Sequence, residues 1–221
     1  MEKREFKDRV YQGITQLTKA LANSHRVEIV ELLAQGEKTV EHIAAETGVS
    51  VANASQHLQV LKGVQLLATR RQGNHIFYRL ANDTVFAAWQ SLRTLGLLQL
   101  AEVAQLVHDF RDERHTLERL SIEELVERQL NEPVVLLDVR PAEEYRLGHI
   151  PQALSMPLTE LAEHARALPT GQLVVAYCRG PFCVFADEAV TYLRGLGYPA
   201  VCLSEGYPDW KQRGLPVAIL N

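Results

Sequence analysis

The feature that most constrains the fold is an uninterrupted apolar run that ends in a cysteine. Residues 173–177 read Leu-Val-Val-Ala-Tyr, and Cys178 follows directly. A run of this length is typical of a strand that is buried on both faces, as in a parallel sheet. Similar runs at 134–138 and 200–203 alternate with helical patterns. The last third of the chain therefore predicts a small α/β domain with a mostly parallel sheet.

Cys178 lies in a short loop between this strand and a helix that follows. Backbone N–H groups at a helix start, together with the helix dipole, favour an anion there. A thiolate is the nucleophilic form of cysteine, and the neighbouring Arg179 favours it. The alternative is a buried structural cysteine before an ordinary helix. The adjacent Arg179 and Gly180 and a second thiol at Cys183 favour the reactive interpretation.

The other two cysteines receive different interpretations. Cys183 is either a partner that attacks a persulfide on Cys178, leaving a disulfide or a sulfur-bridged pair, or a small apolar residue at a helix start. The sequence leaves these two open. Cys202 lies within an apolar strand, which favours a structural role.

The first part of the chain is mainly helical. Apolar periodicity predicts helices at 5–22, 25–35, 39–46 and 50–62. Ser50 is a suitable N-cap for the last of these, whose inward face we expect to hold Val51, Ala54, Leu58 and Leu61. A short helix, a turn and a helix with an uncharged polar face are typical of helix-turn-helix DNA binding. The candidate DNA-contacting residues of this helix are Ser50, Ala52, Asn53, Ser55, Gln56 and Gln59.

A basic hairpin follows this helix. Residues 66–71 and 75–80 alternate like strands, and Gln72-Gly73-Asn74 has turn chemistry. Residues 50–80 contain basic side chains and no acid, although the whole chain has a net charge of −4. This local basic patch favours contact with nucleic acid. The candidate contacts on the hairpin are Arg70, Arg71, His75 and Arg79.

These segments resemble the ArsR family of winged-helix repressors over about residues 15–90. The resemblance rests on Leu21-Ala22-Asn23-Ser24-His25-Arg26, Gly48-Val49-Ser50, Ser55-Gln56-His57-Leu58, and the segment from Arg71-Gln72-Gly73-Asn74 to Tyr78-Arg79-Leu80. It implies a homodimer on a palindromic operator in double-stranded DNA. Metal-sensing members often carry a cysteine pair before the turn, where this chain has Thr39-Val40-Glu41-His42-Ile43.

A long apolar helix is expected from about 83 to 115. Together with 5–22 it would form the dimer interface, because such a stripe needs a second surface. His108 and His115 near its end make a zinc site conceivable, but a solvated helix end is the better interpretation. We therefore predict no metal and no cofactor.

Residues 118–221 resemble a rhodanese domain. The resemblance rests on Leu137-Asp138-Val139-Arg140, Glu143 with Tyr145, Gly148-His149-Ile150-Pro151, Tyr177-Cys178-Arg179 and Gly206-Tyr207 with Asp209-Trp210. It implies that Cys178 takes up sulfane sulfur from a donor as a persulfide and passes it to an acceptor thiol or to cyanide. It also implies an anion cradle of loop N–H groups at Arg179, Gly180, Phe182 and Cys183. Asp138 and Arg140 are expected to position the cysteine loop from neighbouring strand ends. The alternative is an ion pair with no role in the site. Many active rhodanese loops continue after this point with Ser-Gly and a later Arg or Thr. This chain has Gly180-Pro181-Phe182-Cys183 instead, so Arg179 is the only cation of the loop.

Together these features predict two domains, 1–116 and 117–221. The N-terminus has no secretory pattern and no apolar run reaches membrane length, so we expect a cytoplasmic protein without a membrane partner. The favoured hypothesis is a transcription regulator that senses sulfane sulfur or thiol oxidation at Cys178; the family resemblance implies that it is a repressor. The alternative is a sulfurtransferase enzyme that the winged helix tethers or dimerises.

Overall fold

The computed structural model describes residues 1–112 and 117–220. The chain divides into two compact units, Met1–Ser91 and Leu92–Asn221. This division falls within helix α5 (Asp83–Gln99). The predicted domain boundary between 116 and 117 adjoins residues 113–116, which lie outside the described part, and it stays a prediction.

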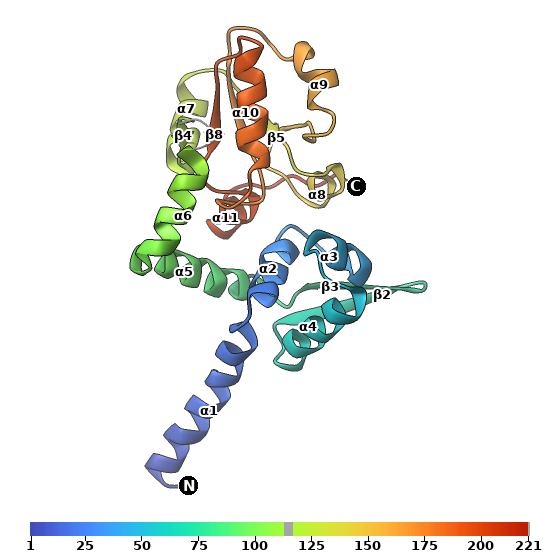
Figure 1. Ribbon diagram of the computed structural model, residues 1–221, viewed down its shortest axis with the longest axis vertical. Coiled ribbons are helices and arrows are strands. Elements are labelled where there is room, and N and C mark those ends of the chain that lie inside the picture. Colours follow the sequence, from blue (N-terminus) through green and yellow to red (C-terminus); the bar gives the residue numbers. More distant parts are fainter. Residues whose placement is uncertain (113–116, 221) are drawn as a thin grey trace. The chain divides into compact units, whose positions relative to one another are not determined.

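The first unit is a helical domain with a β-hairpin (Figure 1). Its elements are α1 (Lys3–Leu21), α2 (Ser24–Leu33), β1 (Lys38–Thr39), α3 (Val40–Glu46), α4 (Val51–Gly63), β2 (Leu67–Gln72) and β3 (His75–Leu80). The strands form an antiparallel sheet in the order β1-β3-β2. A core of buried side chains from α2, α3 and α4 holds this unit together, with Ile29, Ile43 and Leu58 fully buried.

Side-chain caps start the helices where the sequence suggests. Asn23 accepts a hydrogen bond from the N–H of Arg26 at the start of α2, and Thr39 caps α3. The predicted cap at Ser50 is confirmed, since its hydroxyl accepts from the N–H of Asn53. The turn between α3 and α4 therefore has a defined geometry.

The hairpin turn is tighter than expected. Gln72 is still part of β2 and pairs with His75, so the turn contains only Gly73 and Asn74. Gly73 has a φ of 59°, a left-handed conformation that glycine adopts without strain.

The predicted single helix over 83–115 is wrong. Helix α5 ends at Gln99, and a second helix, α6 (Ala101–Asp112), begins after Leu100. The carbonyl of Leu100 accepts from the N–H groups of Val103 and Ala104, so this residue opens a new helix. Apolar periodicity continued through the break, which is why the sequence did not reveal it.

The second unit is built on a five-stranded parallel sheet in the order β4-β8-β7-β5-β6. Its strands are β4 (Arg119–Leu120), β5 (Val134–Asp138), β6 (Leu154–Ser155), β7 (Leu173–Tyr177) and β8 (Ala200–Leu203). Its remaining helices are α7 (Ile122–Asn131), α8 (Ala142–Leu147), α9 (Leu161–His164), the 3-10 turn η1 (Ala165–Ala167), α10 (Phe185–Gly195) and α11 (Tyr207–Gln212). The predicted α/β domain is confirmed.

Both faces of this sheet are covered by helices. Alternate residues of β7 point to opposite sides: Val174 and Ala176 lie in a core with α9 and α10, whereas Val175 and Tyr177 lie in a core with α7 and α11. This two-sided burial explains the continuous apolar run at 173–177. The run ends at Tyr177, so the loop that follows emerges at the carboxyl edge of the sheet.

Candidate functional site

The loop after β7 brings the two cysteines of the predicted site together. Cys178 and Cys183 form a disulfide, with 6.3 Å between their Cα atoms. Only 3% of Cys178 is exposed, whereas Cys183 is half-buried. The N–H of Cys183 donates to the carbonyl of Gly180, 3.1 Å away, which closes the loop on itself. In this disulfide state Cys183 is the more exposed of the two residues.

The N-terminal end of α11 supports this loop from the side. The N–H of Tyr207 donates to the carbonyl of Cys178 at 3.2 Å. A Cβ on Gly206 would lie 2.3 Å from the carbonyl carbon and oxygen of Arg179. The two backbones approach so closely that only glycine fits at this position.

The Arg179 side chain is held by a carboxylate. Its Nε lies 3.1 Å from both oxygens of Glu144, and its Nη2 lies 2.7 Å from Oε1. Glu144 is fully buried. The positive charge that we expected to favour a Cys178 thiolate is therefore largely neutralised by Glu144. Sequence reasoning missed Glu144, because an acidic residue in a short helix carries no signal of its own.

Asp138 and Arg140 form a fully buried ion pair at the end of β5. The Arg140 Nη2 lies 2.6 Å from Asp138 Oδ2 and 2.8 Å from the carbonyl of Gly148. The guanidinium also lies over the rings of Tyr207 and Tyr177, at 4.4 and 5.7 Å from their centres. Since Tyr177 immediately precedes Cys178, the pair fixes the strand end from which the loop emerges. Burial, with the nearby Asp138 charge, raises the pKa of Tyr177.

The hydrogen bonds of the loop bear on the anion cradle, which stays a prediction. Within residues 1–112 and 117–220, the N–H groups of Gly180 and Phe182 have no hydrogen-bond acceptor. Pro181 has no N–H, and that of Cys183 is already bonded to Gly180. In this state of the loop the N–H groups of Gly180 and Phe182 can therefore still donate to an anion.

Cys202 is buried in β8, as expected for a structural residue. Its thiol donates to Asp187 Oδ1 at 3.7 Å. Burial, reinforced by the Asp187 carboxylate, raises the pKa of Cys202 to about 12. A thiol in this environment stays protonated and unreactive at neutral pH.

Helix α4 presents the expected polar face. Ala54, Leu58 and Leu61 are fully buried, and most candidate DNA contacts lie opposite them. Ser50, Ala52, Gln56 and Gln59 are exposed, and Asn53 and Ser55 are half-buried. The prediction that Val51 faces inward is wrong, because 47% of it is exposed. At the first turn of α4, Val51 lies outside the packed part of the helix.

The hairpin side chains differ in how they are held. Arg71, His75 and Arg79 are exposed, and each arginine donates to a nearby backbone carbonyl. Arg70 instead forms an ion pair with Glu37. Hydrogen bonding to Arg70 is the main reason that the pKa of Glu37 is lowered. Arg70 is therefore less available to a phosphate than the sequence suggested.

The N-terminal helix carries an exposed apolar stripe. Its members recur at helical spacing on α1, and between 39% and 53% of each is exposed: Phe6, Val10, Ile14 and Leu17. Figure 1 shows α1 projecting from the other helices of its unit. Such a stripe requires a covering surface.

The described residues contain no group of three or more His, Cys, Asp or Glu side chains able to hold a metal. His108 is exposed on α6, whereas His115, the other histidine of the conceivable zinc site, lies outside them. Among the described helices, none is long and apolar enough to cross a membrane.

Comparison with known proteins finds a matching family model in each of the two units. The model of the bacterial regulatory protein arsR family matches residues 23–68, and that of the rhodanese-like domain matches residues 121–213. The chain is 39% identical to the HTH-type transcriptional regulator Rv0324 of Mycobacterium tuberculosis over 204 residues, 92% of this chain and 89% of the relative.

Two further relatives each match one part of the chain. A sulfurtransferase of Allochromatium vinosum is 34% identical over 87 residues, 39% of this chain and 79% of that protein. The second is a solved structure from Mycobacterium bovis, the homodimeric winged helix-turn-helix DNA-binding domain of a possible ArsR-family regulator. It is 36% identical to this chain, the match covers 45% of this chain and 91% of that domain, and the TM-score is 0.42. With near full-length similarity to one regulator, and with both domain models matched in order, the chain belongs to the ArsR-family HTH-type transcriptional regulators that carry a rhodanese-like domain.

Proposed function

We propose that this regulator reports sulfane sulfur, or thiol oxidation, at Cys178 by changing its affinity for DNA. The observation that carries the proposal is the Cys178–Cys183 pair at the carboxyl edge of the rhodanese-like sheet. Two thiols in bonding distance give the loop a reduced and an oxidised state. Such a two-state element is what a sensor requires.

The chemistry of the loop can balance without a separate oxidant. The Cys178 thiolate attacks the outer sulfur of a hydropersulfide R–S–SH, forming Cys178–S–SH and releasing R–S⁻. The Cys183 thiolate then attacks the Cys178 sulfur, forming the disulfide and releasing HS⁻. The free N–H groups of Gly180 and Phe182 would bind the anionic sulfur during the first step.

On the DNA side, we propose that α4 enters the major groove of a palindromic operator. Asn53, Gln56 and Gln59 have the amide groups that pair with base edges, and Ser50 and Ser55 can contact phosphates. Arg71 and Arg79 on the hairpin would contact the backbone, with His75 beside them. We expect Arg70 to contribute less to phosphate binding, because its guanidinium is already paired with Glu37.

The operator geometry requires two copies of the chain. We propose that the α1 stripe pairs with a second copy, which would cover Phe6, Val10, Ile14 and Leu17. A twofold dimer places its two recognition helices about 34 Å apart, one turn of DNA.

The decisive experiment is operator binding with and without a hydropersulfide donor. For wild type we expect a change in Kd of about 5- to 150-fold, the usual range of coupling between sites. Cys178→Ser and Cys183→Ser should each abolish the change, and Cys202→Ala serves as the matched control that keeps it. Mass measurement of the peptide with residues 178–183 should show the disulfide. An unchanged Kd with a fully formed disulfide would refute the sensor.

The DNA contacts have a separate test. Arg71→Ala and Arg79→Ala should each weaken binding to all sequences and lower the salt dependence by about one unit in slope. Gln56→Ala should change sequence preference and leave that slope nearly constant. Arg70→Ala should act less than Arg71→Ala, because Glu37 compensates its charge.

The second candidate function is enzymatic sulfur transfer. It is favoured by the similarity of residues in this domain to a sulfurtransferase. Multiple turnovers with a sulfur donor and an acceptor thiol, combined with an operator affinity that ignores the donor, would support the enzyme over the sensor.

A further inference from the structure

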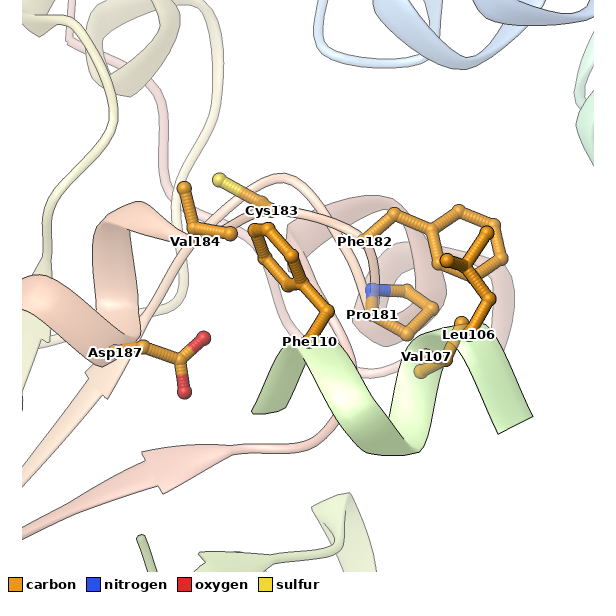
Figure 2. Close-up of a pocket in the computed structure, with 8 residues that line it drawn as sticks. All are labelled: Leu106, Val107, Phe110, Pro181, Phe182, Cys183, Val184 and Asp187. Carbon is orange, nitrogen blue, oxygen red and sulfur yellow. The ribbon is translucent and has the colours of Figure 1, made fainter. Parts of the chain in front are cut away.

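The loop with the disulfide borders an apolar pocket within the second unit. Figure 2 shows Leu106, Val107 and Phe110 of α6 on one side of it. The other side is formed by Pro181, Phe182, Cys183, Val184 and Asp187. The pocket measures about 250 Å³. This is below the roughly 300–1,000 Å³ of pockets for drug-sized ligands, so the pocket suits a smaller organic molecule.

Cys183 is one of the lining residues of this pocket, and its sulfur atom belongs to the disulfide. Cys178, its disulfide partner, does not line the pocket and is buried. A molecule in the pocket therefore meets the disulfide from the Cys183 side. Thiol–disulfide exchange depends on which sulfur is accessible to the attacking thiolate.

The described part of the pocket wall is mainly apolar. None of its lining residues in 1–110 and 117–220 is Lys, Arg or His, and the one charged residue among them is Asp187, whose carboxylate pairs with Arg119. A second anionic group on the bound molecule, besides its reacting sulfur, would lose its water against the described wall without gaining a partner there. An uncharged alkyl or aryl group would replace water against Leu106, Val107 and Phe110, which is favourable.

We infer that the pocket binds a small apolar thiol that reopens the disulfide at Cys183. The thiolate R–S⁻ attacks the Cys183 sulfur, forming R–S–S–Cys183 and releasing Cys178 as a thiolate. A second R–S⁻ attacks the sulfur of R in this mixed disulfide, which gives R–S–S–R and the Cys183 thiolate. Two thiols are oxidised and one protein disulfide is reduced. This inference rests on the proposed function, because it assigns the reset of the same loop.

The test follows the opening of the disulfide in the full-length oxidised protein, without DNA. Butane-1-thiol and 3-mercaptopropionate are compared, and each rate is divided by the rate for the same disulfide in urea-unfolded chain. This division removes differences in thiol reactivity. We expect the normalised rate to favour butane-1-thiol by at least roughly tenfold, since the carboxylate is poorly solvated in an apolar pocket. Equal rates, or a preference for 3-mercaptopropionate, would overturn the inference.

Two further measurements locate the reaction. After rapid alkylation, peptide mass analysis should find the butyl adduct on Cys183 and the alkylating group on Cys178; the opposite pattern contradicts the inference. Leu106→Lys, at a residue that is 69% exposed, adds a cation to the wall without disturbing the core. It should raise the normalised rate of 3-mercaptopropionate several-fold, whereas Leu106→Gln, its neutral control, should not. An equal effect of the two variants would show that the thiol reacts elsewhere. Because no DNA is present, failure here is distinct from failure of the sensor.

Discussion

Replacing Arg93 should test how the second unit holds the end of α11 beside the cysteine loop. Arg93 lies on α5 and pairs with Asp209 on α11; their side chains are 6% and 1% exposed. The other oxygen of Asp209 accepts from the N–H of Gly206 at 3.1 Å. Arg93→Met keeps most of the side-chain volume and leaves the Asp209 carboxylate buried without this cation.

The expected cost follows from the burial. Removing one partner of a buried ion pair typically costs about 3–5 kcal/mol, because the remaining charge has lost both water and partner. An exposed pair is worth only about 0–1 kcal/mol. Arg128→Met is the matched control, because it makes the same change in the same unit but in an exposed pair with Glu132.

Urea unfolding followed by tryptophan fluorescence can measure this difference. The chain has two tryptophans, Trp89 and Trp210. In a Trp89→Phe background the signal comes from Trp210, which is buried next to Asp209. We expect Arg93→Met to lower the free energy of unfolding of this unit by several times the loss in Arg128→Met. A loss below about 1 kcal/mol, or equal losses in both variants, would refute the reasoning.

Two other changes probe the surroundings of the loop. Gly206→Ala should destabilise the second unit by about 1–3 kcal/mol in the same unfolding assay, because the added Cβ meets the Arg179 backbone. Gly195→Ala is its control: a Cβ there has open space, so this variant should be neutral or slightly stabilising. For Cys202, the folded pKa is raised to about 12 from an ordinary 9.0. Its stabilising contribution is therefore complete below pH 9 and is lost as pH rises toward 12. Between pH 8 and pH 10.5 the oxidised wild type should lose more stability than Cys202→Ala, and parallel losses would contradict this.

The pattern of apolar residues predicted the fold where burial has a clear period. Burial of both faces of the parallel strands produced the continuous apolar runs at 134–138 and 173–177, and caps such as Ser50 marked helix starts. The break at Leu100 escaped because apolar residues continue across it on both helices. Val51 was wrongly predicted to face inward. It fits the apolar periodicity of α4, but it lies in the first turn of that helix, outside the packed core.

The candidate site was predictable in its positions but not in its pairings. The place of Cys178 after a buried strand follows from local sequence. The partners of Arg179 and Arg70 are separated from them by 35 and 33 positions along the chain. Such ion pairs depend on how the elements pack, and no local pattern encodes them. The disulfide between Cys178 and Cys183 was an open alternative because spacing alone does not fix the distance between two thiols.

Helix α5 begins in the first unit and ends in the second, so the proposed sensor can be tested at its contacts. Its first turn contributes Val85 to the core of that unit, and Arg93, two turns later, pairs with Asp209. Asp209 in turn holds Gly206, whose backbone lies against Arg179 in the cysteine loop. The ion pair joins α5 to the segment that packs against the cysteine loop, so a response that depends on these contacts should depend on Arg93. The Arg93→Met variant tests this dependence under conditions where the protein remains folded. It should still bind the operator, but its operator Kd should change much less than that of wild type when a hydropersulfide is added. A full response in the folded variant would show that the signal takes another route.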